Sequence, residues 1–209
     1  MVVCESRHFQ GKNRECLFFF ERQGKTDIRI FDFKSEQLIY KNSSPICFRI
    51  GASVITSGRL ILLLGGLLPE DNYSSVCSFV DIYDNDATHF KKPWKRGKNM
   101  NVPRKDFAAV NYNNRIYCFG GFDSHNIAIL NGEYMNTADG VWTMLTNKIP
   151  LPLRDATACC VGDHIAVYDS WSKGRIRTMN VHTEEWEVWT ENEDENMLLQ
   201  GKGFLFTSS

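Results

Sequence analysis

The sequence predicts an all-β fold made of about four copies of one four-stranded unit. Three patterns support this prediction: a short apolar run that ends in two glycines, an arginine upstream of that run, and a pair of large apolar residues downstream of it. Successive runs end at Glu21, Gly65, Gly120 and Asp169, about 50 residues apart. One pattern alone could arise by chance, but three in phase indicate a structural repeat.

The apolar run is clearest in the middle of the chain, where residues 59–66 resemble residues 115–121. Each is a short apolar segment closed by two glycines. This pattern predicts a buried strand followed by backbone that needs positive φ or a close approach. Weaker copies that lack the glycines occupy residues 16–22 and 164–170. We expect this run to be the second strand of each unit.

An arginine precedes the last three runs by 15 or 16 residues. The three arginines are Arg49, Arg104 and Arg154. Small and apolar residues follow each of them, over 51–54, 107–110 and 156–161. Small side chains suit strands that crowd together near an axis, so we expect the first strand of each unit here.

Downstream of each run, two large apolar residues stand seven positions apart. The pairs are Phe31 and Leu38, Tyr83 and Phe90, Met135 and Trp142, and Met179 and Trp186. The first member is always followed by Asp or Asn, residues that favour turns. These pairs predict the third and fourth strands of each unit.

Together these residues resemble the kelch repeat, in which an Arg-led first strand precedes a diglycine and then a Tyr and a Trp at about this spacing. The resemblance implies a kelch-type β-propeller of about four four-stranded blades, with the first strand of each blade innermost. It implies one domain over 1–209 with repeats at 1–48, 49–103, 104–153 and 154–196, while 197–209 would form a partial fifth blade or closing strands. Kelch propellers usually close with more blades. This ring would therefore be incomplete or divergent, and an open ring could associate with a second copy.

Composition narrows the classes of partner. The formal net charge of −1 provides no general attraction to nucleic acid or to an anionic membrane. The longest apolar run, Leu60–Leu64, is too short to span a bilayer. Seven cysteines, an odd number without a CxxC spacing, favour free thiols in a reducing compartment. We therefore expect a cytoplasmic protein, with the nucleus as the alternative, and no membrane partner.

Two charged segments admit a functional and a structural interpretation. Residues 91–105 carry seven positive charges around Trp94, which would suit phosphate contacts and base stacking. They would equally suit an outer strand whose lysines protect an exposed edge, and we favour that interpretation. Residues 184–195 carry seven carboxylates and could meet a metal or a basic partner. The alternation of Trp186 and Val188 with glutamates instead favours a half-buried edge strand.

The resemblance also places a partner-binding face on the loops of the propeller. In kelch proteins that bind peptides, the segment leading into each first strand and the loop after each diglycine supply the side chains. The residues singled out here are Arg49, Arg104, Lys105, Asp106, Phe122, Asp123, Ser124, His125, Arg154 and Asp155, and Ile50 and the post-diglycine loops 67–75 and 122–126 belong to the same face. Arginine suits this role because its planar fork can grip a carboxylate. The alternative is that the repeated arginines bond to backbone carbonyl groups between blades.

The expected function is therefore a non-catalytic module that binds a protein or peptide, as an adaptor for a substrate or a scaffold, with no cofactor. Kelch-like propellers that are copper or iron enzymes, oxidases or lyases, provide one alternative. The five histidines are scattered, however, and no catalytic motif is present, so no catalytic or metal-binding residue is predicted. Nucleic-acid binding through 91–105 is the other alternative, and it is not favoured.

Overall fold

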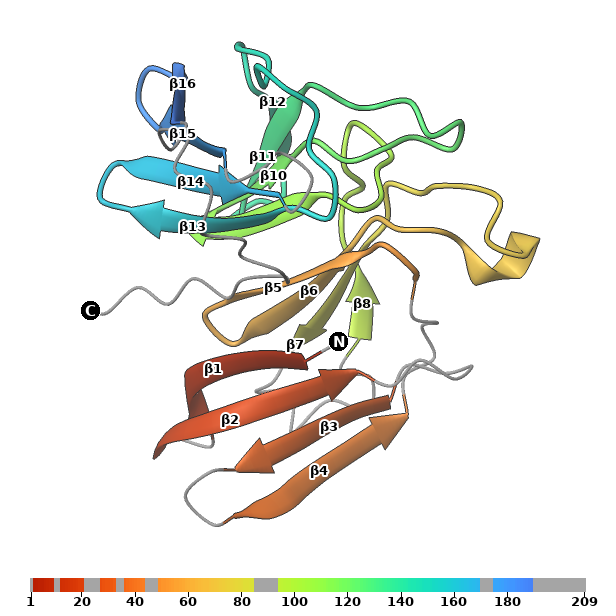
Figure 1. Cartoon of the computed structure of the whole chain (residues 1–209). Coiled ribbons are helices and arrows are strands. Elements are labelled where there is room, and N and C mark those ends of the chain that lie inside the picture. The colour runs from red at the N-terminus through yellow and green to blue at the C-terminus, as the bar shows by residue number, and fades with distance from the viewer. Residues whose placement is uncertain are drawn as a thin grey trace, which may run out of the picture.

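The computed structural model describes residues 2–9, 12–20, 27–32, 36–43, 49–84, 94–169 and 175–189, and it is almost entirely β (Figure 1). The strands form four four-stranded antiparallel sheets, each following chain order, which we call blades 1 to 4. A single 3₁₀ turn, η1 (Pro69–Asp71), follows the second strand of blade 2. No helix in these described residues is long and apolar enough to cross a membrane.

The strand bounds follow the predicted repeat. Blade 1 holds β1 (Val2–Phe9), β2 (Lys12–Phe20), β3 (Asp27–Asp32) and β4 (Gln37–Ser43). Blade 2 holds β5 (Ser53–Ser57), β6 (Leu60–Leu64), β7 (Val80–Asp84) and β8 (Trp94–Arg96). Blade 3 holds β9 (Ala108–Tyr112), β10 (Arg115–Phe119), β11 (Gly132–Asn136) and β12 (Trp142–Met144). Blade 4 holds β13 (Thr157–Val161), β14 (His164–Tyr168), β15 (Ile176–Asn180) and β16 (Trp186–Trp189).

The first strands of blades 2 to 4 lie side by side, with β9 between β5 and β13 (Figure 1). Ser53 Oγ donates to the carbonyl oxygen of Phe107 (2.8 Å), and Asn111 Nδ2 donates to that of Thr56 (3.0 Å). In a propeller the first strand of each blade is the innermost one, and this arrangement matches that geometry. The expected kelch-type, all-β propeller architecture is confirmed.

Apolar side chains packed between neighbouring blades form the core. The layer between blades 2 and 3 holds Leu62, Leu64, Val80, Met100, Phe107, Ile116, Cys118, Met135 and Trp142. The layer between blades 3 and 4 holds Val110, Tyr117, Phe119, Leu145, Leu153, Ile165, Val167 and Met179. Burial of each large side chain stabilises the fold by about 1.5–3 kcal/mol, so adjacent blades hold each other in place.

The spaced apolar pairs join the third and fourth strands, as the sequence predicts. Directly opposed residues are Phe31 and Leu38, Met135 and Trp142, and Met179 and Trp186. In blade 2 the prediction was wrong, because Tyr83 lies opposite Trp94 and not Phe90. Residues 85–93 separate these two strands, a longer connection than in the other blades, and Phe90 lies outside the described residues. Trp94 is buried edge-to-face on Tyr83, with ring centroids 5.3 Å apart.

The diglycines meet both backbone requirements that the sequence predicts. Gly65 and Gly66 have φ of 58° and 93°, and Gly120 and Gly121 have φ of 67° and 86°. A Cβ at Gly65 would collide with the carbonyl oxygen of Arg104. Only glycine combines this conformation with such a close approach of two blades.

The two charged segments contribute outer strands. β8 is the outermost strand of blade 2, where Lys95 and Arg96 are exposed while Trp94 is buried. Trp94 therefore offers no stacking platform for a base. β16 is the edge strand of blade 4, with Trp186 half-buried. Residues 190–209, including the predicted partial fifth blade, lie outside the described residues.

Candidate partner-binding face

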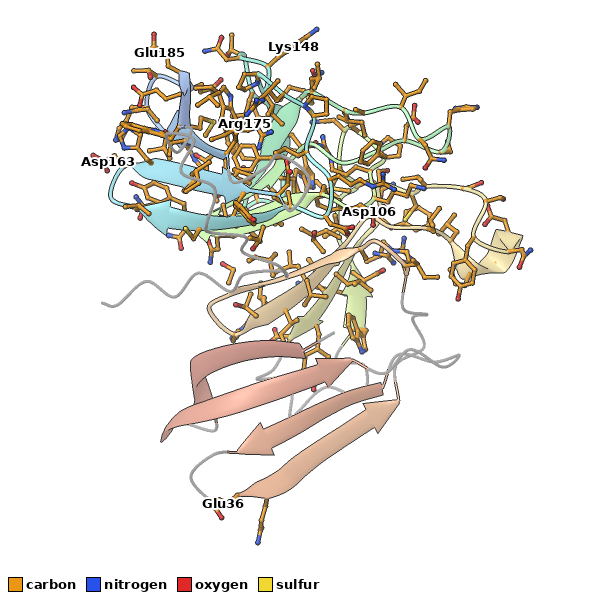
Figure 2. The ribbon with its side chains drawn as sticks, in the orientation of Figure 1. Glu36, Asp106, Lys148, Asp163, Arg175 and Glu185 are labelled. Atoms are coloured by element: carbon orange, nitrogen blue, oxygen red, sulfur yellow. The ribbon has the colours of Figure 1, made fainter. Side chains whose placement is uncertain are left out.

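The segments that lead into the first strands pair with the loops that follow the diglycines. Ile50 forms a β-bridge with Leu67, and Lys105 forms one with Phe122. The amide of Asp106 (labelled in Figure 2) donates to the carbonyl oxygen of blade 2's Gly51 at 2.8 Å. We call the lead-in residues 50–51, 105–106 and 154–155, together with loops 67–79 and 122–131, the loop face. Both loops extend to the right in Figure 1.

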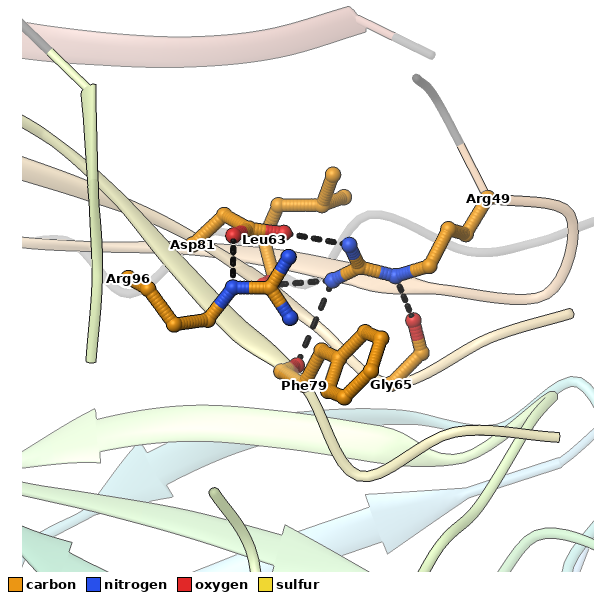
Figure 3. Close-up of polar contacts among 6 residues, drawn as sticks. All are labelled: Arg49, Leu63, Gly65, Phe79, Asp81 and Arg96. Atoms are coloured by element: carbon orange, nitrogen blue, oxygen red, sulfur yellow. Dashed lines mark hydrogen bonds and ion pairs between the residues drawn. The ribbon is translucent and has the colours of Figure 1, made fainter. Parts of the chain in front are cut away.

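Arg49, the first predicted binding arginine, is buried within blade 2, with 2% of its surface exposed. Its guanidinium donates to the carbonyl oxygens of Gly65 and Leu63 (3.0 Å) and forms an ion pair with Asp81 (Figure 3). Asp81 also pairs with Arg96 at 2.7 Å. Arg49 therefore closes the diglycine end of its own blade and has no capacity to reach a partner.

Arg104 plays the same part in blade 3 and is fully buried. It donates to the carbonyl oxygens of Gly120 (2.8 Å) and Asn131 (3.1 Å) and pairs with Glu133 at 2.9 Å. Glu133 in turn accepts the backbone amides of residues 101–102 at 2.8 and 3.2 Å. Both arginines thus bond to backbone carbonyl groups, as in the alternative that the sequence left open, but these groups belong to the blade that each arginine leads into and do not link two blades.

Blade 4 builds the equivalent pair with its charges exchanged. Arg177 lies on β15, the third strand of blade 4, at the position that Asp81 holds in blade 2 and Glu133 holds in blade 3. In each blade this residue lies opposite the second-strand residue that is two positions before the end of the apolar run. The Arg177 guanidinium pairs with Asp169 at 3.1 Å, and Asp169 stands where the first glycine of the diglycine would be. Leu153, fully buried, takes the place of the lead-in arginine.

Arg154 consequently differs from the two buried arginines. One residue of each lead-in segment has positive φ two places before its strand begins: Gly51 (70°), Asp106 (55°) and Asp155 (48°). Alignment on these residues places Arg154 level with Ile50 and Lys105. Arg154 precedes the end of its apolar run by 15 residues, one fewer than Arg49 and Arg104 do, because of this shift of one position. The shift leaves Arg154 exposed on the loop face.

Eight of the ten predicted binding residues lie at least partly exposed on this face. Ser124, His125 and Arg154 are exposed, and Lys105, Asp106, Phe122, Asp123 and Asp155 are partly buried. The Arg154 guanidinium carbon lies 5.7 Å from the centre of the Phe122 ring, which joins blade 4 to the loop of blade 3. Such a cation–π contact contributes about 0.5–1 kcal/mol at an exposed site.

Two exposed apolar residues on the loop face were not singled out from the sequence, although Tyr73 lies within the predicted loop 67–75, and Ile127 lies one residue beyond the predicted loop 122–126. Tyr73 is 39% exposed in loop 67–79, and Ile127 is 64% exposed in loop 122–131. Each follows an asparagine with positive φ, Asn72 (59°) and Asn126 (58°). The recurrence of Asn followed by an apolar residue after each diglycine was the sequence signal that could have identified them.

Carboxylates give these loops their shape. Asp123 accepts the backbone amides of His125 (2.9 Å) and Ile127 (2.8 Å). Asp71 accepts the amide of Ser74 at 3.1 Å. Hydrogen bonding, first from the Ser75 side chain and then from Ser74, lowers the pKa of Asp71. The hydrogen bonds to these two carboxylates fix the backbone of both loops.

The thiols show no sign of an activated nucleophile among the residues with described side chains. Cys77, Cys118, Cys159 and Cys160 are free, and burial raises the pKa of each of these thiols. The pKa of Cys160 rises to about 11. Within the same part of the chain, no group of three or more His, Cys, Asp or Glu residues is placed to hold a metal ion.

Comparison with known proteins agrees with the repeat. Residues 103–148, which cover blade 3, match the family model of the Kelch motif. The chain is 26% identical over 114 residues to beta-scruin of Limulus polyphemus, covering 53% of this chain and 12% of that protein. It is 24% identical over 121 residues to a putative F-box/kelch-repeat protein of Arabidopsis thaliana, covering 56% of this chain and 34% of the relative. The chain thus spans about a third or less of the length of these relatives.

Proposed function

Because this chain is built of kelch repeats, we propose that it is a non-catalytic module that binds a protein partner through the loop face. The supporting observation is the division of labour among its basic residues. Arg49 and Arg104 are engaged in buried ion pairs, whereas Lys105, one position after Arg104, is partly exposed, and Arg154, which aligns with Lys105, is exposed. Stable blades require the buried arginines Arg49 and Arg104, but they do not require cations at the positions of Lys105 and Arg154.

The loop face has the features of a recognition surface. Its loops are held by backbone hydrogen bonds, such as the one from the Phe122 amide to the Lys105 carbonyl oxygen at 2.9 Å, so little conformational freedom is lost when a partner binds. Arg154 combines a cationic fork with the neighbouring Phe122 ring. Arginine and aromatic residues are enriched among those that dominate binding energy at interfaces.

We further propose an adaptor role, in which the loop face holds a client or scaffold protein. The name of one relative, a putative F-box/kelch-repeat protein, supports this role, because it combines such repeats with an F-box in one chain. The partner would be a folded protein or a peptide segment.

The test is affinity capture with the full chain as bait, followed by mass spectrometry of the captured proteins. The double variant Lys105→Ala, Arg154→Ala removes the two cations of the lead-in segments that are at least partly exposed. Arg59→Ala is the matched control, because Arg59 is 61% exposed at the opposite end of the blade, where it pairs with Asp84. We expect the double variant to lose a specific set of proteins that wild type and Arg59→Ala retain.

Equal recovery of the same proteins by all three baits would refute the loop-face assignment. Elemental analysis of the purified chain addresses the enzyme alternative. Copper or iron in stoichiometric amount would overturn the non-catalytic assignment, because it would show a resident metal centre.

A further inference from the structure

We infer that two rigid apolar tips, Tyr73 and Ile127, anchor the partner, and that the partner presents apolar side chains beside Lys or Arg. This inference rests on the proposed function, since it assigns a chemical character to whatever occupies the loop face. It adds the tips of the two post-diglycine loops to the predicted binding residues.

The tip of loop 67–79 holds a tyrosine in an uncommon conformation. Tyr73 has φ of 61°, a left-handed region that bulky residues rarely adopt. Its amide donates to the carbonyl oxygen of Leu68 (2.9 Å), and the Leu68 amide donates to that of Ser75 (2.9 Å), which holds the loop closed over η1. The ring nevertheless remains 39% exposed. Strained backbone that presents a side chain to solvent is typical of binding sites.

Loop 122–131 repeats this design in the next blade. Asp123 accepts two amides of the loop, and its own amide donates to the carbonyl oxygen of Ile127 at 3.1 Å. Asn126, with φ of 58°, turns the chain so that the Ile127 side chain is 64% exposed. An isoleucine so exposed loses contact with water when it is covered, which favours association. Because both tips are fixed, they lose little conformational freedom on binding.

The charge of the two loops indicates what surrounds the partner's apolar residues. The loop face as a whole carries five carboxylates, those of Glu70, Asp71, Asp106, Asp123 and Asp155, against the two cations Lys105 and Arg154, and loops 67–79 and 122–131 themselves contain no lysine or arginine. A partner with acidic residues beside its apolar ones would be repelled at both tips, whereas one with Lys or Arg would be attracted. The complementary partner segment is therefore apolar and basic.

A random-peptide library displayed on phage provides a probe that assumes no partner. The library is selected on the immobilised full chain, and the most enriched peptide is synthesised for affinity measurement. Its binding is compared across wild type, Tyr73→Asn, Ile127→Ser and Glu70→Lys. Asn tolerates positive φ, so Tyr73→Asn removes the ring while keeping the loop conformation. Val141→Ser is the control, because Val141 is 44% exposed in the turn between β11 and β12.

We expect enriched peptides in which aromatic or aliphatic residues stand next to Lys or Arg. Each tip variant should weaken binding of the chosen peptide about tenfold, and Val141→Ser should leave it unchanged. Glu70→Lys should weaken binding and flatten its dependence on salt. Thermal melts should show that the tip variants stay folded, since both side chains are exposed.

The inference is overturned if no peptide is enriched, if enriched peptides are acidic, or if both tip variants bind as tightly as wild type. Its failure differs from that of the proposed function. If the double variant Lys105→Ala, Arg154→Ala loses captured proteins while the tip variants capture all of them, the loop face is supported and the role of the tips is refuted. Unchanged capture by all variants would remove both.

Discussion

Arg104→Ala should destabilise the chain by about 3–5 kcal/mol, because it leaves Glu133 as an uncompensated charge in a fully buried position. The variant also removes donors from the carbonyl oxygens of Gly120 and Asn131. Each buried acceptor without a partner costs about 1–3 kcal/mol, so the upper half of the range is expected. Arg154→Ala, at an exposed position, should cost less than about 1 kcal/mol.

Urea unfolding followed by tryptophan fluorescence measures both free-energy changes. A parallel thermal melt should show the midpoint of Arg104→Ala lowered by about 10 °C, since each kcal/mol moves the Tm of a chain of this size by about 2–4 °C. A second variant isolates the charge. Arg104→Leu with Glu133→Gln should be more stable than Arg104→Leu alone, because the glutamine side chain is neutral and its carbonyl oxygen still accepts a backbone amide. Equal stabilities of Arg104→Ala and Arg154→Ala would refute a structural role for Arg104.

Two further predictions concern backbone and pH. Gly121→Ala should destabilise the chain by about 2 kcal/mol or more in urea unfolding, because a Cβ there meets the Lys105 carbonyl oxygen. Gly140→Ala is the control and should cost only about 1 kcal/mol, because Gly140 has positive φ but open space around it. Similar losses of stability for the two variants would contradict the close-approach argument. Burial raises the pKa of the Cys160 thiol from its ordinary value of 9.0 to about 11. The thiol's contribution to the free energy of unfolding is therefore fully present below pH 9.0 and is lost as the pH rises through about 11. Urea melts across this interval should show a smaller alkaline loss of stability for Cys160→Ala than for wild type, and parallel losses would contradict burial of this thiol.

Strand positions and pairing were predictable from sequence because each depends on local chemistry. Asn136 illustrates this, since it ends β11 and its side chain accepts the amide of Ala138 at 3.0 Å to form the turn. Opposed pairs such as Met135 and Trp142 follow from a turn of fixed length. The prediction failed for Phe90 because the connection in blade 2 is longer. The aromatic that reaches the core is then chosen by tertiary packing, which spacing cannot report.

The candidate site was harder to predict because burial distinguishes residues that look alike in sequence. Arg104 and Arg154 each precede an apolar strand by a similar distance, yet one is fully buried and the other is exposed. The deciding partner of Arg104 is Glu133, 29 residues away along the chain. Only the register of β11 against β10 brings that carboxylate under the lead-in segment. Tyr73 and Ile127 were missed for the same reason, since their exposure depends on how the loops close.

The exchanged charges of blade 4 explain why the outer repeats look degenerate. A buried ion pair lies at the end of the apolar run in blades 2, 3 and 4, and in blades 2 and 3 the acid of that pair is on the third strand while glycine follows the run. When arginine takes the third strand, as Arg177 does, the acid moves into the glycine position as Asp169. In blade 1, Arg29 lies opposite Phe19, in the register of Arg177, and the sequence places a glutamate two residues after Phe19. Loss of the diglycine in blade 4 thus accompanies the reversal of the pair, so this repeat preserves the electrostatic closure while departing from the sequence pattern.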